Sequence, residues 1–282
     1  MKKKAHLVLG SGGARGIAHI GVIEMLERDG YDICEVAGCS MGAVVGGMYC
    51  GGYLEAYTDW LLKLNWTGVF NLMDFTLTRK GFIKGERVFS KMQEITGEQL
   101  IENMKIPFTA VATDMMTMKE VYFRKGSLYS ALRASVSIPG LFTPIIENGT
   151  VLVDGGVLNP LPLNLIKKEE DALVIAVNLN GKPDLDTEEK TQEEAKEKGW
   201  LTRFLSADPK NTGPNFSLID LVYTSYDFTQ DRLIALMIEH YKPDLVVEIP
   251  RNACGIFDFH RADELIEMGR VAYKEATKRY LN

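Results

Sequence analysis

The chain has 282 residues, of which 46% are hydrophobic and 25% are charged, and its formal net charge at pH 7 is -6. This length and composition suit one large domain with a sizeable core, and the negative charge argues against a nucleic-acid-binding role. No apolar run reaches the length of about 18 residues that a membrane-spanning helix needs.

The N-terminal residues and the cysteines bear on the compartment. Met1 to Lys4 resemble the charged start of a signal peptide, but the apolar run that follows ends at Gly10 and is too short for its apolar region. The four cysteines are Cys34, Cys39, Cys50 and Cys254. Their spacing is typical neither of a metal site nor of a disulfide framework. We therefore expect a reduced, cytoplasmic protein.

The first predicted element is a buried strand over Ala5–Leu9. A glycine-rich turn follows, Gly10-Ser11-Gly12-Gly13-Ala14-Arg15-Gly16, and the apolar residues from Ile17 to Leu26 then have the spacing of a helix packed on a sheet. Such a turn presents unpaired backbone N–H groups, which bind anions. Two anions suit it, a cofactor pyrophosphate and the oxyanion of an acyl-transfer intermediate.

The spacing of Gly10, Gly12 and Gly16 is similar to the dinucleotide-binding fingerprint. That fingerprint also has an acidic residue at the end of the second strand, where it holds the ribose. Here Gly38-Cys39-Ser40 occupies that end, and Glu35 lies inside the predicted strand. No Lys-Ser or Lys-Thr pair follows the glycines to form a P-loop. The sequence therefore favours the oxyanion.

The second predicted strand leads into Gly38-Cys39-Ser40-Met41-Gly42. This pattern is typical of a sharp turn between a strand and a helix that presents an activated serine. Gly38 and Gly42 let the two backbones approach closely, and the helix dipole favours negative charge near the hydroxyl. With 26 glycines in the chain, the pentapeptide alone is modest evidence, so its context matters.

Farther along, strand-like and helix-like segments alternate, as a mostly parallel sheet requires. Strands are predicted over Phe108–Thr113, Val121–Arg124, Val151–Val153, Leu173–Val177 and Leu245–Ile249, and helices over Leu54–Leu64, Glu86–Ile95, Leu218–His240 and Asp263–Tyr280.

A nucleophilic serine needs a base, and none of the four histidines lies in an obvious motif. His6 and His19 fall within the first strand and the first helix, where packed structural roles are common. His240 ends a predicted helix and suits its C-terminal dipole. His260 is the best candidate for a triad, because its late position follows the Ser, Asp, His order of α/β-hydrolases.

Asp154 is a stronger candidate for the base. Val151-Leu152-Val153-Asp154-Gly155-Gly156 describes a short strand that delivers a carboxylate into a tight turn, although an ordinary Asx turn has the same pattern. Asp154 can take the Ser40 proton directly if burial in an apolar cleft raises its pKa.

Three blocks of this sequence resemble, in the same order, the signature blocks of the patatin-like phospholipase family: Ser11–Gly16, Gly38–Gly42 and Asp154–Gly156. Further segments similar to that family are Ala134–Pro144, Asn159–Pro162 and Phe257–Tyr280. The resemblance spans nearly the whole chain. It implies one patatin-like domain over residues 1–282, with a three-layer α/β/α fold around a mostly parallel sheet.

The resemblance also implies a function, the hydrolysis of acyl esters of lipids by a Ser-Asp dyad. Ser40 would be the nucleophile and Asp154 the base, and the backbone N–H groups of Gly12, Gly13 and Ala14 would form the oxyanion hole. No cofactor and no metal are implied. Expected substrates are phospholipids, lysophospholipids or simpler acyl esters. The alternatives are a thioesterase or acyltransferase of the same chemistry and a non-catalytic regulatory protein on this scaffold.

Two residues of the glycine-rich turn leave a choice open. Many family members have glycine at the position of Ser11. The Cβ of Ser11 restricts the turn, which leaves open which of the N–H groups face the oxyanion. Arg15 either binds a phosphate head group or supports the loop, since arginine pairs with carboxylates and phosphates alike.

Two apolar stretches suggest contact with lipid. Residues 66–82 are rich in aromatic and aliphatic side chains, which suit a lid, an interfacial foot or part of the core. Trp200 to Leu205 have a similar composition. Either one would bring peripheral membrane contact. Between them, Asp184–Lys198 is nearly all polar or charged, which fits a solvated surface helix or a mobile excursion.

Overall fold

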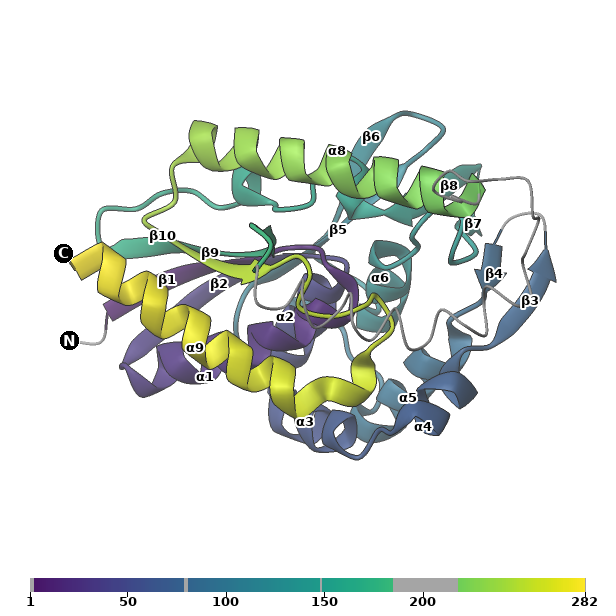
Figure 1. Cartoon of the computed structure of the whole chain (residues 1–282), viewed down its shortest axis with the longest axis horizontal. Coiled ribbons are helices and arrows are strands. Elements are labelled where there is room, and N and C mark those ends of the chain that lie inside the picture. The colour runs from purple at the N-terminus through teal and green to yellow at the C-terminus, as the bar shows by residue number, and fades with distance from the viewer. Residues whose placement is uncertain (1–2, 79–80, 148, 185–217, 282) are drawn as a thin grey trace, which may run out of the picture.

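The structure is a computed structural model that describes residues 3–78, 81–147, 149–184 and 218–281 (Figure 1). Within these residues, eight strands form one sheet in the order β10-β9-β1-β2-β5-β8-β7, with β6 also paired to β5. The pairs from β10 to β5 are parallel, whereas the pairs of β8 with β5, β7 with β8 and β6 with β5 are antiparallel. Their bounds are β1 Lys3–Leu9, β2 Tyr31–Cys39, β5 Phe108–Asp114, β6 Lys119–Phe123, β7 Ile145–Glu147, β8 Thr150–Asp154, β9 Ala172–Gly181 and β10 Leu245–Pro250.

Helices cover both faces of this sheet, so the predicted three-layer α/β/α fold is confirmed. In Figure 1, α8 crosses one face, and α1, α2 and α9 cover the other. The described α-helices are α1 Ala18–Arg28, α2 Met41–Cys50, α3 Leu54–Leu62, α4 Trp66–Leu72, α5 Glu86–Thr96, α6 Leu128–Ser135, α8 Leu218–Tyr241 and α9 Ala262–Leu281. Strands β3 Phe75–Thr78 and β4 Gly81–Ile83 form a separate two-stranded sheet.

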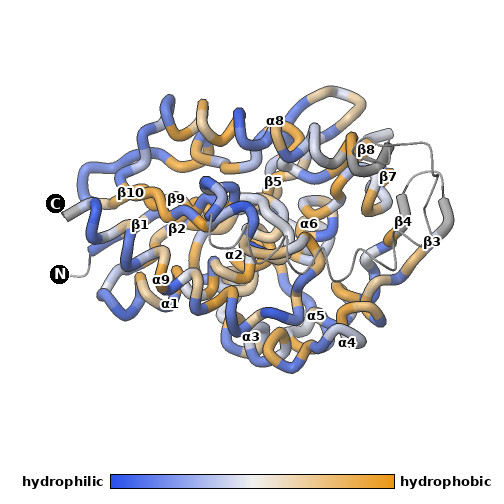
Figure 2. Tube along the Cα trace, in the orientation of Figure 1, coloured by the Kyte–Doolittle hydropathy of each residue, from blue (hydrophilic) through white to orange (hydrophobic). Residues whose placement is uncertain are grey.

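Successive residues of a strand pack into different cores, because side chains alternate between the two faces of a sheet. Leu7 and Leu9 of β1 belong to the larger core, which includes residues of α1, α2 and α9. Val8 belongs to a smaller core with Ile234 of α8. Burial on both faces explains the nearly continuous apolar runs of the central strands. In Figure 2 the long outer helices α8 and α9 instead alternate between hydrophilic and hydrophobic residues.

Most predicted elements lie within a few residues of those observed, but some short ones were not predicted. The long predicted helices correspond to α3, α5, α8 and α9. Helices α4 and α6 are only seven and eight residues long, too short to show a clear helical period. The stretch Trp200 to Leu205 lies outside the described residues, as does Asp184–Lys198 apart from Asp184 itself.

Strand β5 brings two distant segments together. One edge of β5 pairs with β6 along residues 110–114, so β2 and β8 share the opposite edge. Strand β2 ends there with Cys39 opposite Val111, and β8, running the other way, ends with Asp154 opposite Ala112. The two strands therefore meet end to end at consecutive residues of β5. This places the residue after Cys39 beside Asp154.

Candidate active site

Ser40 lies in the sharp turn between β2 and α2. Its φ of 54° is rare for a residue other than glycine, and such strained backbone is concentrated at functional sites. The flanking glycines are required by close contacts of the backbone. A Cβ on Gly38 would lie 2.5 Å from the carbonyl oxygen of Gly42, and a Cβ on Gly42 would lie 2.2 Å from that of Leu9. The sequence therefore forms the expected turn.

The hydroxyl of Ser40 donates a hydrogen bond of 2.6 Å to Oδ2 of Asp154, and both residues are buried. The other carboxylate oxygen, Oδ1, accepts from the N–H of Gly156 at 2.7 Å and from the hydroxyl of Tyr226, on α8, at 3.4 Å. Burial raises the pKa of Asp154 to about 6, although these hydrogen bonds favour the ionised form. At neutral pH the carboxylate is therefore mostly ionised and can accept a proton.

Other side chains hold this pair, and the sequence analysis did not single them out. The N–H of Ser40 donates to Oγ of Ser135 at 2.9 Å, and Ser135 in turn donates to the carbonyl of Val111 at 2.6 Å. Ser135 thus ties the turn to β5. The thiol of Cys39 lies 3.9 Å from Oδ1 of Asp154, and burial raises its pKa, so it is protonated. The only sequence signal for Ser135 was its place in the segment similar to the patatin-like family.

The glycine-rich turn lies next to Ser40, and Gly13 lines the same pocket. The N–H of Ala14 donates to the carbonyl of Ile256 at 3.0 Å, so in this structure it is not free to bind an oxyanion. In the described part of the chain, the N–H groups of Gly12 and Gly13 have no acceptor. Gly13 has a φ of 58°, and a Cβ there would lie 2.6 Å from Cγ1 of Ile256.

Arg15 is buried beneath this turn and contacts its backbone. Its Nε donates to the carbonyl of Gly12 at 3.0 Å, and its Nη1 donates to the carbonyl of Arg251 at 2.5 Å. Its Nη2 lies 3.8 Å from a carboxylate oxygen of Asp227, on α8. These contacts are those of a residue that supports the loop. Ser11 is also buried, and its N–H donates to the carbonyl of Pro160 at 2.9 Å.

The histidines lie elsewhere. His19 is buried on α1, where its Nε2 lies 3.0 Å from the carbonyl of Gly10 and burial lowers its pKa to about 4. His6 lies between two glutamates, His240 contacts Tyr241, and the ring of His260 stacks on Trp66. Among the described residues, no histidine is hydrogen-bonded to Ser40 or Asp154.

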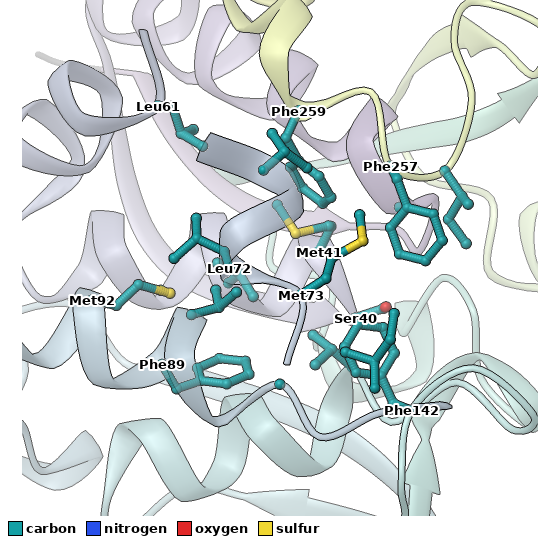
Figure 3. Close-up of a pocket in the computed structure, with 18 of the residues that line it drawn as sticks. Ser40, Met41, Leu61, Leu72, Met73, Phe89, Met92, Phe142, Phe257 and Phe259 are labelled. Atoms are coloured by element: carbon teal, nitrogen blue, oxygen red, sulfur yellow. The ribbon is translucent and has the colours of Figure 1, made fainter. Parts of the chain in front are cut away.

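Ser40 opens into a pocket whose wall is almost entirely apolar. Figure 3 shows the Ser40 hydroxyl at one side of this pocket, with Met92 and Leu61 across from it. The wall comes mainly from α2, α3, α4, α5 and the loops that precede β7 and η5 (Phe259–Arg261). Representative lining residues are Met41, Val44, Leu61, Leu72, Met73, Phe89, Met92, Phe142, Phe257 and Phe259. Such a lining matches a hydrocarbon chain and leaves no place for a charged group.

The part of the chain that the structure describes contains no group of three or more His, Cys, Asp or Glu residues that could hold a metal ion. Among the described helices, none combines the length and the apolar character needed to cross a membrane.

Comparisons with known proteins bear on the family and on the fold. The family model of the patatin-like phospholipase matches residues 7–166. An uncharacterized NTE family protein of Mycobacterium tuberculosis is 33% identical over 333 residues, which cover 97% of this chain and 91% of that protein. The neuropathy target esterase sws of Drosophila melanogaster is 30% identical over 188 residues, which cover 64% of this chain and 13% of that protein.

A solved structure is similar in fold. The crystal structure of VipD from Legionella pneumophila matches with a TM-score of 0.50 and 12% sequence identity, over 99% of this chain and 67% of that chain. At this identity the match concerns the fold alone.

Proposed function

The chain belongs to the patatin-like phospholipase family, and we propose that it hydrolyses acyl esters of lipids with Ser40 as nucleophile and Asp154 as base. Membership supports a lipid acyl hydrolase activity. The observation that carries the assignment of residues is the 2.6 Å hydrogen bond from Ser40 Oγ to Asp154 Oδ2, beside an apolar pocket. No histidine is needed, because the carboxylate itself is within reach of the serine proton.

The proposed reaction has two halves. Asp154 takes the proton of Ser40 as Oγ attacks the ester carbonyl, and the N–H groups of Gly12 and Gly13 stabilise the oxyanion of the tetrahedral intermediate. The intermediate expels the alcohol, which receives the proton from Asp154, and the acyl group remains on Ser40. Water then attacks this acyl-enzyme while Asp154 takes one of its protons. Collapse of the second intermediate releases the fatty acid and returns the proton to Ser40.

The pocket supports an acyl chain as the group that is bound. Its side-chain lining contains no ionised group, so burying a phosphate or an ammonium there would be costly. We propose that the chain of a phospholipid, lysophospholipid or other acyl ester occupies the pocket and that its polar part stays outside.

The first prediction concerns Ser40. Ser40→Ala should abolish turnover of a short p-nitrophenyl ester, because it removes the nucleophile, and the protein should stay folded, because Gly38 and Gly42 still allow the turn. A fluorophosphonate should label the wild type at Ser40, as mapped by peptide mass spectrometry. Ser90→Ala, which changes an exposed serine of α5, is the matched control and should keep full activity. Labelling of another serine, or activity of Ser40→Ala within a few-fold of wild type, would refute the assignment.

A further inference from the structure

Helix α4 and the start of β3 together carry a cluster of exposed aromatic side chains. Trp66, Phe70 and Phe75 are 62%, 50% and 57% exposed. The ring centroids of Trp66 and Phe70 are 6.1 Å apart, and those of Phe70 and Phe75 are 5.3 Å apart. We call these three residues the aromatic cluster. Large apolar side chains that gather in contact with water mark an interaction surface.

The inner side of the same segment belongs to the pocket. Val69, Leu72 and Met73 line the pocket into which Ser40 opens, and Figure 3 shows Leu72 and Met73 pointing into it. Trp66 also stacks on His260 of η5, with ring centroids 6.5 Å apart, and the neighbouring Phe259 lines the pocket as well. The aromatic cluster and the pocket therefore lie on opposite sides of one short stretch of chain.

Hydrogen bonds fix the segment that carries the aromatic cluster, so its rings are exposed on an ordered part of the structure. The side chain of Asn65 caps α4 by accepting from the N–H of Gly68 at 2.8 Å. The carboxylate of Asp74 accepts from the N–H groups of Gly85 and Glu86, at 2.5 and 2.8 Å, and so joins the chain after α4 to the start of α5.

We propose that the aromatic cluster docks the protein on the surface of a lipid bilayer, next to the acyl pocket. The choice of a bilayer rests on the proposed function, because lipid esters reside there, and on the continuity of the cluster with the pocket wall. Tryptophan and phenylalanine partition favourably into the membrane interface. Helix α4 has no charged residue, and a net charge of -6 would be repelled by anionic lipid, so docking depends on apolar burial. A neutral phosphatidylcholine surface is therefore sufficient.

The test is sedimentation with phosphatidylcholine vesicles, with all proteins in the Ser40→Ala background so that the lipid is not consumed. The triple variant Trp66→Gln, Phe70→Gln, Phe75→Thr should bind at least about tenfold more weakly, because it lacks the three exposed rings whose transfer from water into the bilayer favours binding. Binding of the unsubstituted protein should persist at high salt, which screens charge attraction but not apolar burial. The matched control is Met116→Ser with Met118→Ser, which changes side chains 64% and 81% exposed in the β5–β6 turn and should bind normally.

Activity separates this proposal from the proposed function. With Ser40 present, the triple variant should hydrolyse a monomeric p-nitrophenyl ester at the wild-type rate, which also shows that it is folded, and should lose activity on vesicles. If it does not fold, Trp66→Gln alone should still weaken vesicle binding at least threefold. Wild-type protein that binds vesicles but hydrolyses no ester would refute the proposed function and support the docking surface.

Other outcomes would overturn the docking surface while leaving the function intact. These are ester hydrolysis without vesicle binding, equal loss of binding in the control variant, and binding that needs anionic lipid and disappears at high salt. A dimer of the wild type that the triple variant dissociates, together with absent vesicle binding, would make the cluster an interface between two copies of this chain.

Discussion

The buried carboxylate of Asp154 couples the proposed activity to pH. Its pKa is about 6, so the proposed base is ionised above this pH and protonated below it. We expect kcat/KM for a soluble ester to fall by about tenfold for each pH unit below about 6. Tyr226→Phe should shift this fall in kcat/KM to higher pH, because it removes a hydrogen bond that favours the ionised carboxylate.

Substitutions of the candidate bases discriminate between a dyad and a triad. Asp154→Asn should be nearly as inactive as Ser40→Ala, since an amide cannot accept the serine proton, and the two losses should be far from additive. His19→Gln, His240→Gln and His260→Gln should each keep turnover within about tenfold of wild type. A folded His260→Gln that binds substrate without turnover would point to a Ser-His-Asp triad instead.

Asp154 also affects stability. In the unfolded chain its pKa is near the ordinary value of 3.8, and in the folded protein it is about 6, so the folded state binds the proton more tightly. The destabilisation of the folded state by the buried charge is therefore fully present above pH 6 and is lost as the pH falls towards 3.8. We expect Asp154→Asn to raise the free energy of unfolding by about 1 to 3 kcal/mol at pH 8.

Thermal or urea unfolding at pH 8 and near pH 4 would measure this difference. The gain of Asp154→Asn over wild type should shrink at the lower pH, because wild-type Asp154 is then protonated in the folded state. An equal difference at both pH values would show that the amide changes packing and not the cost of the charge. Loss of activity together with gain of stability is expected where a group is kept for its chemistry.

At the scale of an element, the glycine-rich turn depends on the side chain beneath it. Arg15 donates to the carbonyl of Gly12 and, across the chain, to that of Arg251, so it fixes the direction of the backbone N–H groups proposed for the oxyanion hole. We expect Arg15→Gln to lower kcat for a p-nitrophenyl ester by about 10- to 100-fold with little change in KM, because misdirected donors weaken transition-state stabilisation.

The ester has no phosphate, and this makes the experiment decisive between the two roles considered for Arg15. A head-group role would leave turnover of the ester intact and raise KM for a phospholipid. Arg15→Lys is the useful companion variant, because it keeps the positive charge but lacks the planar guanidinium that donates to the carbonyls of Gly12 and Arg251 at once. It should resemble Arg15→Gln if the loop is what matters.

At the scale of the whole molecule, the sheet joins segments from distant parts of the chain. Strand β1 lies between β2 and β9, and α9 packs against α1. We therefore propose that the described residues form a single cooperative unit. A fragment ending at residue 166, where the family match ends, would leave one edge of β1 unpaired and expose the face that α9 covers.

Such a fragment should fail to fold, whereas the full chain should unfold in one transition. Far-UV circular dichroism and tryptophan fluorescence during urea unfolding of the full chain should give the same midpoint. Separate midpoints, or a folded and monomeric fragment, would show that the chain contains more than one folding unit.

Residues close together in the chain could be interpreted without the tertiary structure. The turn at Ser40 was predictable, because the contacts that demand Gly38 and Gly42 arise from the geometry of the turn and the strand beside it. The longer elements were predictable as well, since several turns of a helix or a buried strand repeat their pattern often enough to be recognised. Resemblance to a family then linked Ser40 with Asp154.

The contacts between distant segments were decided by the tertiary structure alone. Ser40 and Asp154 are 114 residues apart, and they meet because β2 and β8 end at neighbouring residues of β5, a consequence of strand order that no local pattern carries. The bond from Ala14 to Ile256 is equally non-local. Helix α4 has barely two turns, so the apolar residues of 66–82 could not be divided beforehand between the pocket and the aromatic cluster. Short elements take their orientation from what they pack against.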